Sequence, residues 1–151
     1  MTRSDEYWMT QALLSAEEAL RLDEVPVGAC LVASDGNLLA SAFNKTISDC
    51  DPTAHAEILA LRQAAIQLSN YRLLGSTVYS TVEPCVMCAG ALVNARVSRL
   101  VFGTRDERFG GVVSRFRLCD SELLNHRIEI VEGVLSAECR KLMQDFFESR
   151  R

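Results

Sequence analysis

The segment after Pro84 carries two cysteines three positions apart, Cys85 and Cys88, at the predicted start of a helix. Backbone N–H groups and the helix dipole at such a place favour the thiolate over the thiol, and thiolates are good zinc ligands. A lone pair with this spacing is equally compatible with a redox pair or with two buried cysteines. The pair therefore needs a further ligand elsewhere in the chain before it predicts a metal site.

His55 and Glu57 lie about thirty residues earlier, at the predicted start of another helix. Positions i and i+2 are roughly 200° apart around a helix axis, so both side chains approach one point only near the helix end. His55 would then join the two thiols as the third metal ligand, between two helix N-termini. Three protein ligands leave zinc a fourth position for water, which is typical of a catalytic site.

The charges of this ligand set indicate a task for Glu57. Two thiolates and a neutral imidazole cancel the charge of a zinc ion, so its bound water is less acidic than in a site with three histidines. A base must then assist. Glu57 can accept the water proton and deliver protons to a ring nitrogen and a departing amine. The predicted chemistry is hydrolytic deamination, in which ammonia leaves and a carbonyl remains.

Alternating strands and helices after an initial hairpin are predicted to position these residues. Apolar spacing indicates a first helix over about 6–22, and the Asp35–Gly36 turn pair lies between two strand-like runs. This pattern predicts one α/β domain over residues 1–151, with a mixed five-stranded sheet covered by helices on both faces. The expected strands are 27–33, 37–43, 77–82, 99–102 and 128–131, and the later helices are 55–67, 84–94 opened by Pro84, and 136–147 capped by Ser136.

Composition excludes several classes of protein. Hydrophobic residues make up 48% and charged residues 24%, values ordinary for a globular enzyme rather than a membrane or disordered protein. No apolar run reaches a membrane-spanning length and the start lacks the pattern of a secretory signal, so we expect a cytoplasmic protein with no membrane partner. The net charge of −4 argues mildly against nucleic acid. Seven arginines against four acids over 96–127 are compatible with a basic face or with an ordinary solvated surface.

The four remaining cysteines are not needed for this site. A chain without an export signal is expected in a reducing compartment, where burial or metal binding explains thiols better than disulfides do. Cys30, Cys119 and Cys139 lie in or beside apolar stretches and are predicted to be small buried side chains. Cys50 lies in a polar stretch, is predicted to be exposed and receives no role.

The H-x-E and P-C-x-x-C motifs together, in this order, are typical of zinc-dependent deaminases. From about Trp8 to Arg151 the chain resembles the cytidine deaminase superfamily, and more closely bacterial tRNA-specific adenosine deaminases of the TadA type. That resemblance implies a three-layer α/β/α cytidine-deaminase-like fold, one zinc ion per subunit, a homodimer, and conversion of the wobble adenosine in a tRNA anticodon loop to inosine. It is carried by 24–29, 51–57, 83–90, 102–103 with 105–106, and 125–127, whereas 109–124 follow the family pattern only in part.

Substrate contacts are implied by this resemblance alone. Asn44 matches an asparagine that hydrogen-bonds the flipped base, and Asp106 matches an aspartate close to the sugar of the target nucleotide. Without the resemblance, they would be a strand-end asparagine and a surface acid. The other implied substrate-binding residues are Arg108, Asn125 and His126, together with Phe147 and Arg150 on a C-terminal helix that meets the anticodon loop.

Two alternatives stay open at this level. The first is a deaminase of a free base or nucleoside, such as guanine or cytidine, because these enzymes share the zinc ligands and the glutamate. Val86 between the cysteines, Asn44 and the arginine-bearing C-terminal half favour the tRNA substrate. The second is a structural zinc ion closed by a fourth cysteine. Glu57 argues against it, since a closed site has no use for a base beside the metal.

Overall fold

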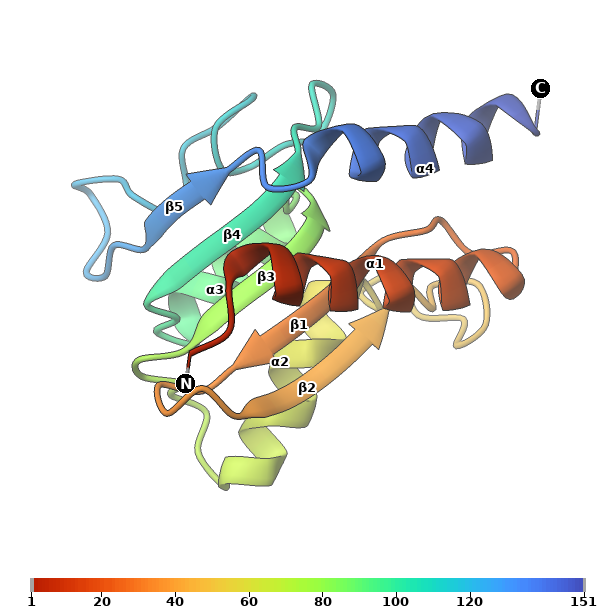
Figure 1. The fold of residues 1–151 in the computed structure, drawn as a ribbon. Coiled ribbons are helices and arrows are strands. Elements are labelled where there is room, and N and C mark those ends of the chain that lie inside the picture. The colour runs from red at the N-terminus through yellow and green to blue at the C-terminus, as the bar shows by residue number, and fades with distance from the viewer. Residues whose placement is uncertain (1, 151) are drawn as a thin grey trace.

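The computed structural model describes residues 2–150, which form a five-stranded sheet between two layers of helices (Figure 1). The hairpin, the helices and the strands predicted from the sequence are all present. In chain order the elements are α1 (Asp5–Arg21), β1 (Gly28–Val32), β2 (Leu38–Phe43), α2 (Ala56–Leu68), β3 (Thr77–Val82), α3 (Val86–Asn94), β4 (Arg99–Thr104), β5 (Glu129–Glu132) and α4 (Ser136–Glu148).

The sheet is mixed, with strand order β2-β1-β3-β4-β5. β1 pairs antiparallel with both β2 and β3, whereas β3, β4 and β5 run parallel. The turn between β1 and β2 requires a left-handed backbone at Gly36, whose φ is 88°, and glycine adopts this conformation without a steric penalty. The parallel pair β3 and β4 is connected through α3, as a crossover between parallel strands requires. Parallel strands place their carboxyl ends at one edge, which is where ligands bind in such sheets.

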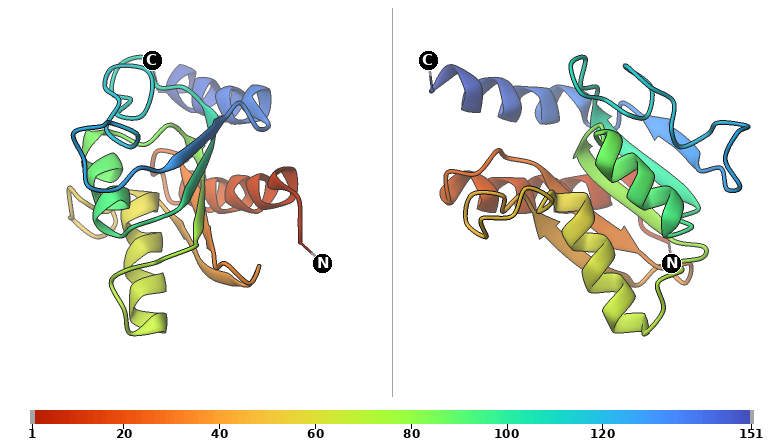
Figure 2. Two further views of the ribbon diagram at one scale, coloured as in Figure 1. Left: turned by 90° about the vertical axis from the view of Figure 1, so that its left-hand side faces the viewer. Right: turned by 180° about the vertical axis from the view of Figure 1, so that it is seen from behind.

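Helices cover both faces of the sheet, with α1 and α4 on one face and α2 and α3 on the other (Figure 2). Trp8 and Met9 of α1 pack with Tyr79 and Val101 of the central strands on the first face. α1 lies so close to β1 that a Cβ atom on Gly28 would collide with its backbone. A larger apolar cluster fills the space under α2 and α3. The three-layer α/β/α architecture expected from the sequence is therefore confirmed.

Three helix starts differ from the sequence-based expectation. His55 is the N-cap of α2 rather than its first residue. Pro84 lies outside α3, because Cys85 has an extended backbone and is the N-cap of the helix. The Pro84 carbonyl accepts a hydrogen bond from the backbone N–H of Gly111. Ser136 is the first residue of α4 rather than its cap. The cap position is held by Leu135, whose φ of 53° places it in the left-handed region after a tight turn.

Two further expectations can be compared with the described residues. Cys30, Cys119 and Cys139 are buried and Cys50 is exposed, as predicted. Across residues 2–150, every helix is too short or too polar to span a lipid bilayer.

Candidate active site

Three side chains that can bind a metal meet where α2 and α3 begin. His55 is the N-cap of α2, Cys85 is the N-cap of α3, and Cys88 follows in the first turn of α3. The Nδ1 atom of His55 lies 3.5 Å from the Cys85 Sγ atom and 3.4 Å from the Cys88 Sγ atom. Tetrahedral zinc with bonds of about 2.3 Å to sulfur and about 2.0 Å to nitrogen places such atoms about 3.5 Å apart. The group therefore has the spacing of a zinc ligand set.

The electrostatics of this group favour a cation. A hydrogen bond from Cys88 lowers the pKa of the Cys85 thiol to about 4, and a hydrogen bond from His55 adds to the effect. Both thiols also lie at the N-terminus of α3, where the helix dipole stabilises negative charge. The thiolate is thus favoured at Cys85, whereas the hydrogen bond to Cys85 and burial raise the pKa of the Cys88 thiol well above its ordinary value. Zinc binds thiolates, so Cys88 would lose its proton when the metal binds.

No fourth protein ligand joins the group among residues 2–150. Cys30, Cys119 and Cys139 are buried elsewhere, and Cys50 is exposed in the loop before α2. A structural site closed by four protein ligands is therefore not formed by the described part of the chain. One coordination position would remain for water, as in catalytic zinc sites.

Glu57 is a buried acid beside the ligand group, in contact with Cys88. Its side chain is 3% exposed, and its Oε1 atom is buried with no hydrogen-bond partner. Burial raises the pKa of the Glu57 carboxyl to about 7, which suits a group that must accept and return protons near neutral pH. A buried carboxyl oxygen without a partner costs free energy unless a ligand or water supplies the hydrogen bond. This atom thus marks a place for a reacting molecule.

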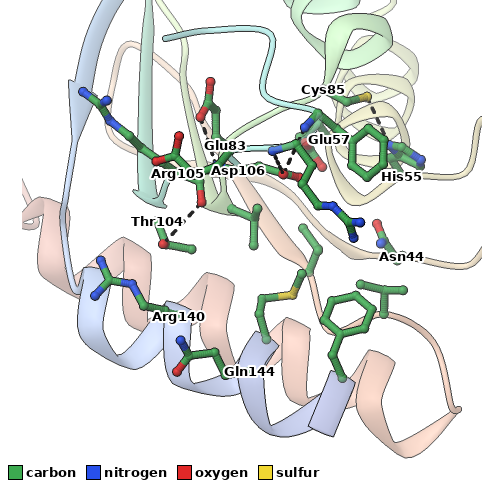
Figure 3. A pocket seen from close by; sticks show the side chains of 18 of the residues that line it. Asn44, His55, Glu57, Glu83, Cys85, Thr104, Arg105, Asp106, Arg140 and Gln144 are labelled. Atoms are coloured by element: carbon green, nitrogen blue, oxygen red, sulfur yellow. Dashed lines mark hydrogen bonds between the residues drawn. The ribbon is translucent and has the colours of Figure 1, made fainter. Parts of the chain in front are cut away.

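A cavity of about 820 Å³ opens in front of Glu57 and His55 (Figure 3). Its size is in the range of sites for small molecules and cofactors. The strand ends and the loops around the ligand group form one side of it, and α4 forms the other. The residues of α4 that line it are Arg140, Met143, Gln144 and Phe147, spaced as one face of a helix.

Four of the predicted substrate residues line this cavity, namely Asn44, Asp106, Arg108 and Phe147. The Oδ1 atom of Asn44 accepts a hydrogen bond of 2.8 Å from the backbone N–H of Ala56 at the start of α2. This contact fixes the orientation of the amide at the cavity wall. Asp106 is held in a similar way, because its Oδ1 atom accepts the backbone N–H groups of Arg108 and Phe109.

Three other predicted substrate residues do not line the cavity. Asn125 accepts a hydrogen bond from Arg96, and His126 donates one of 2.7 Å to the carbonyl of Val97, so both lie against the segment after α3. Arg150 lies over the ring of Phe146 and pairs with Asp23, which follows α1. The expected neighbour of Arg150 in the tail, Arg151, lies outside the described residues.

Several residues that shape the cavity were not singled out from the sequence. Arg140 and Gln144 line it from α4 (Figure 3), and their helical spacing with Phe147 was a signal that could have found them. Glu24 and Glu83 are buried acids that hold loops beside the site. For Glu83, burial alone would raise the pKa, but hydrogen bonds from Ser114 and from backbone N–H groups lower it below its ordinary value.

Comparisons with known proteins agree with this site. The family model of the cytidine and deoxycytidylate deaminase zinc-binding region matches residues 2–104. The chain is 48% identical over 147 residues to the tRNA-specific adenosine deaminase of Haemophilus influenzae, covering 97% of this chain and 85% of that protein. A structure from studies of A-to-I editing by tRNA:A34 deaminases superposes with a TM-score of 0.86 at 39% identity, covering 90% of this chain and 98% of the other.

A guanine deaminase of Bacillus subtilis is also similar, with a TM-score of 0.65 at 33% identity, over 68% of this chain and 66% of that one. A guanine deaminase of Nitrosomonas europaea superposes with a TM-score of 0.83 over 97% of this chain, but at 24% identity, so this likeness shows the fold alone. Sequence identity, rather than superposition, favours the tRNA-specific adenosine deaminases. The fold and the ligand group thus define a deaminase of the zinc-binding cytidine and deoxycytidylate deaminase class. Within that class, the chain belongs to the tRNA-specific adenosine deaminase family.

Proposed function

We propose that this protein hydrolyses adenosine to inosine at the wobble position of a tRNA anticodon, releasing ammonia. One observation carries the reaction type: the unpartnered carboxyl oxygen of Glu57 lies at a cavity that also reaches His55 and Cys85 of the ligand group. The similarity to the Haemophilus influenzae enzyme supports the choice of substrate. An anticodon loop suits such a site because its bases are unpaired and can be turned into a pocket at low cost.

His55, Cys85 and Cys88 would hold one zinc ion per subunit, which when bound supplies a Lewis acid that polarises water. Glu57 accepts one proton of the attacking water as the oxygen adds to the ring carbon bearing the amine, and passes that proton to the ring nitrogen. It then accepts the remaining proton of the added hydroxyl and delivers it to the amine, so that ammonia leaves and a carbonyl remains. The burial of Glu57 supports this role, since its pKa lies near neutrality.

The proposed substrate contacts follow from the positions of the cavity residues. Asn44 has its amide oxygen engaged by α2, which leaves its amide nitrogen to donate to the base. Asp106 also lines the cavity and is proposed to contact the sugar of the target nucleotide. Arg108 is proposed to contact a phosphate. Phe147 of α4 offers a half-exposed ring on which a base of the loop can stack.

Asn125, His126 and Arg150 are proposed to act outside the base pocket, where the wider anticodon stem-loop would extend. The homodimer implied by the family is also a proposal, as is the single domain over 1–151. We expect the protein in the cytoplasm, because its proposed substrate is used there in translation.

The experiment compares four substrates of the zinc-loaded protein: an anticodon stem-loop with a wobble adenosine, free adenosine, cytidine and guanine. Inosine from the stem-loop alone is the expected result. Xanthine from guanine or uridine from cytidine, with no inosine from the stem-loop, would move the protein to the salvage of free bases or nucleosides. A stem-loop with guanosine at the wobble position serves as the matched control for RNA binding without reaction.

A further inference from the structure

Glu83 is a buried acid at the end of β3 that has no part in the reaction described above. Its side chain is 3% exposed. The Oε2 atom accepts the backbone N–H groups of Val112, Val113 and Ser114 at 3.1, 2.8 and 2.9 Å. The Oε1 atom accepts the backbone N–H of Asp106 at 3.0 Å and the Ser114 hydroxyl. One carboxylate thus collects five hydrogen bonds from both ends of a single loop.

The loop that Glu83 holds, residues 106–114, forms part of the cavity wall. Asp106, Arg108 and Phe109 all line the cavity. The loop contains no helix and only an isolated bridge between Gly110 and Cys85. Such a segment depends on tertiary contacts for its conformation, because it has few regular backbone hydrogen bonds of its own. The carboxylate of Glu83 supplies the largest set of these contacts.

Two glycines let the loop approach Glu83 closely. A Cβ atom on Gly110 would collide with the Glu83 carboxyl group, and one on Gly111 would lie 2.9 Å from the backbone of Cys85 and Val86. Neither glycine has a positive φ, so the space around them, rather than backbone conformation, is what excludes a side chain. The carboxylate cannot easily move away, since five hydrogen bonds hold it in place.

We propose that Glu83 is a positioning residue for substrate recognition, whose carboxylate holds the loop 106–114 as a wall of the substrate cavity. It acts through Asp106, Arg108 and Phe109 and does not touch the reacting atoms. The inference rests on the proposed function only for the identity of the substrate that the wall contacts. Loss of the carboxylate is expected to weaken substrate binding while the ligand group and Glu57 stay in place.

The chemistry of the two oxygens predicts a graded effect. In Glu83→Gln, the amide oxygen can still accept the backbone N–H groups of Val112, Val113 and Ser114. The amide nitrogen then takes the place of Oε1 and cannot accept a hydrogen bond, so the N–H of Asp106 loses its acceptor. Only the Asp106 end of the loop should then loosen. In Glu83→Ala, all the backbone N–H groups lose their partner and the whole loop should be released.

Residue-resolved amide hydrogen exchange measures how firmly the loop 106–114 is held. The kcat and KM for the stem-loop measure substrate recognition, and the zinc content is determined for each variant. Glu83→Gln should speed exchange at Asp106 alone. Glu83→Ala should speed it at Asp106, Val112, Val113 and Ser114 and raise KM at least tenfold, with kcat changed less than threefold. Asp5→Asn, which removes a partly buried ion pair far from the cavity, is the control for general destabilisation and should leave KM unchanged.

Gly110→Ala tests the same contact from the side of the loop. Its rise in KM should be similar to that of Glu83→Ala, and the double variant should be no worse than Glu83→Ala, because the shortened side chain leaves room for the new methyl group. Additive effects of the two substitutions would overturn the proposal. So would unchanged exchange in Glu83→Ala, or a loss of kcat accompanied by a loss of zinc, which would make Glu83 a support of the ligand group. If the wild-type protein forms no inosine, the proposed function fails, whereas the exchange data still test whether Glu83 holds the loop.

Discussion

The Nδ1 atom of His55 lies 3.5 Å from the Sγ atom of Cys85, although thirty positions separate the two residues in the chain. Each is the N-cap of its own helix, so the contact forms only when α2 and α3 pack on the same face of the sheet. The ligand group therefore exists only in the folded protein. Metal binding and folding are expected to be coupled for this reason.

Removal of the metal should lower the thermal stability of the protein. A ligand that binds only the folded state stabilises it by about 4 kcal/mol at a thousandfold excess over its dissociation constant. We expect a chelator to lower the melting temperature measured by circular dichroism, and added zinc to restore it. Cys88→Ala should lose the metal and this response, whereas Cys50→Ala, at an exposed position, should keep both. Stoichiometric zinc in Cys88→Ala would mean that the ligand set has been misassigned.

Glu57→Gln should retain zinc and lose turnover. The amide keeps the volume of the buried side chain but cannot accept the proton, and positioned proton transfer contributes about 10²–10⁴-fold to such reactions. Inosine formation under single-turnover conditions measures the loss, and metal analysis measures zinc. Glu17→Gln, an exposed substitution on α1, is the control. Deamination by Glu57→Gln at a rate near that of the wild type would show that another group moves the proton.

Arg140→Ala should weaken binding of the stem-loop and reduce its dependence on salt. Arg140 lines the cavity and forms no ion pair among residues 2–150, so its charge is available for a phosphate. Loss of one phosphate contact reduces the slope of log affinity against log salt by about 0.7–0.9. Fluorescence anisotropy with a labelled stem-loop over a range of salt concentrations measures this slope. Arg72→Ala, at an exposed position in the loop between α2 and β3, should keep the wild-type slope, and an unchanged slope in Arg140→Ala would exclude the contact.

The ion pair between Asp5 and Arg99 should contribute stability that is lost in acid. Its N–O distance is 2.7 Å, and the hydrogen bonds to Arg99 lower the pKa of the Asp5 carboxyl below its ordinary value of 3.8. A lowered pKa in the folded state means that the contribution is fully present above pH 3.8. It is lost as the pH falls through that value toward the lower folded pKa.

Asp5→Asn should therefore cost about 1.5–3 kcal/mol in the free energy of unfolding near neutral pH and less below pH 3.8. Urea unfolding of both proteins at several pH values measures the difference. Asp23→Asn removes an exposed pair with Arg150 and should change stability by less than about 1 kcal/mol. An equal cost of Asp5→Asn at all pH values would contradict this origin of the stability.

Much of the ligand group and of the layer architecture followed from local patterns. The spacing of Cys85 and Cys88, and of His55 and Glu57, identified two helix starts with side chains suited to zinc and to proton transfer. Alternation of strands and helices gave the order of the elements. These signals work because helix periodicity, turn chemistry and ligand type depend on residues that are close in the sequence.

Only the tertiary structure decided which side chains reach the cavity. Asn44 and Asp106 do, whereas Asn125 and His126 lie against the segment after α3. The role of Glu83 was equally invisible, since its partners are loop N–H groups more than twenty positions away. Every residue except proline carries a backbone N–H group. No pattern of residue types therefore indicates which of these groups a distant carboxylate will bind. That choice depends on where the loops lie once α3 and α4 have packed on opposite faces of the sheet.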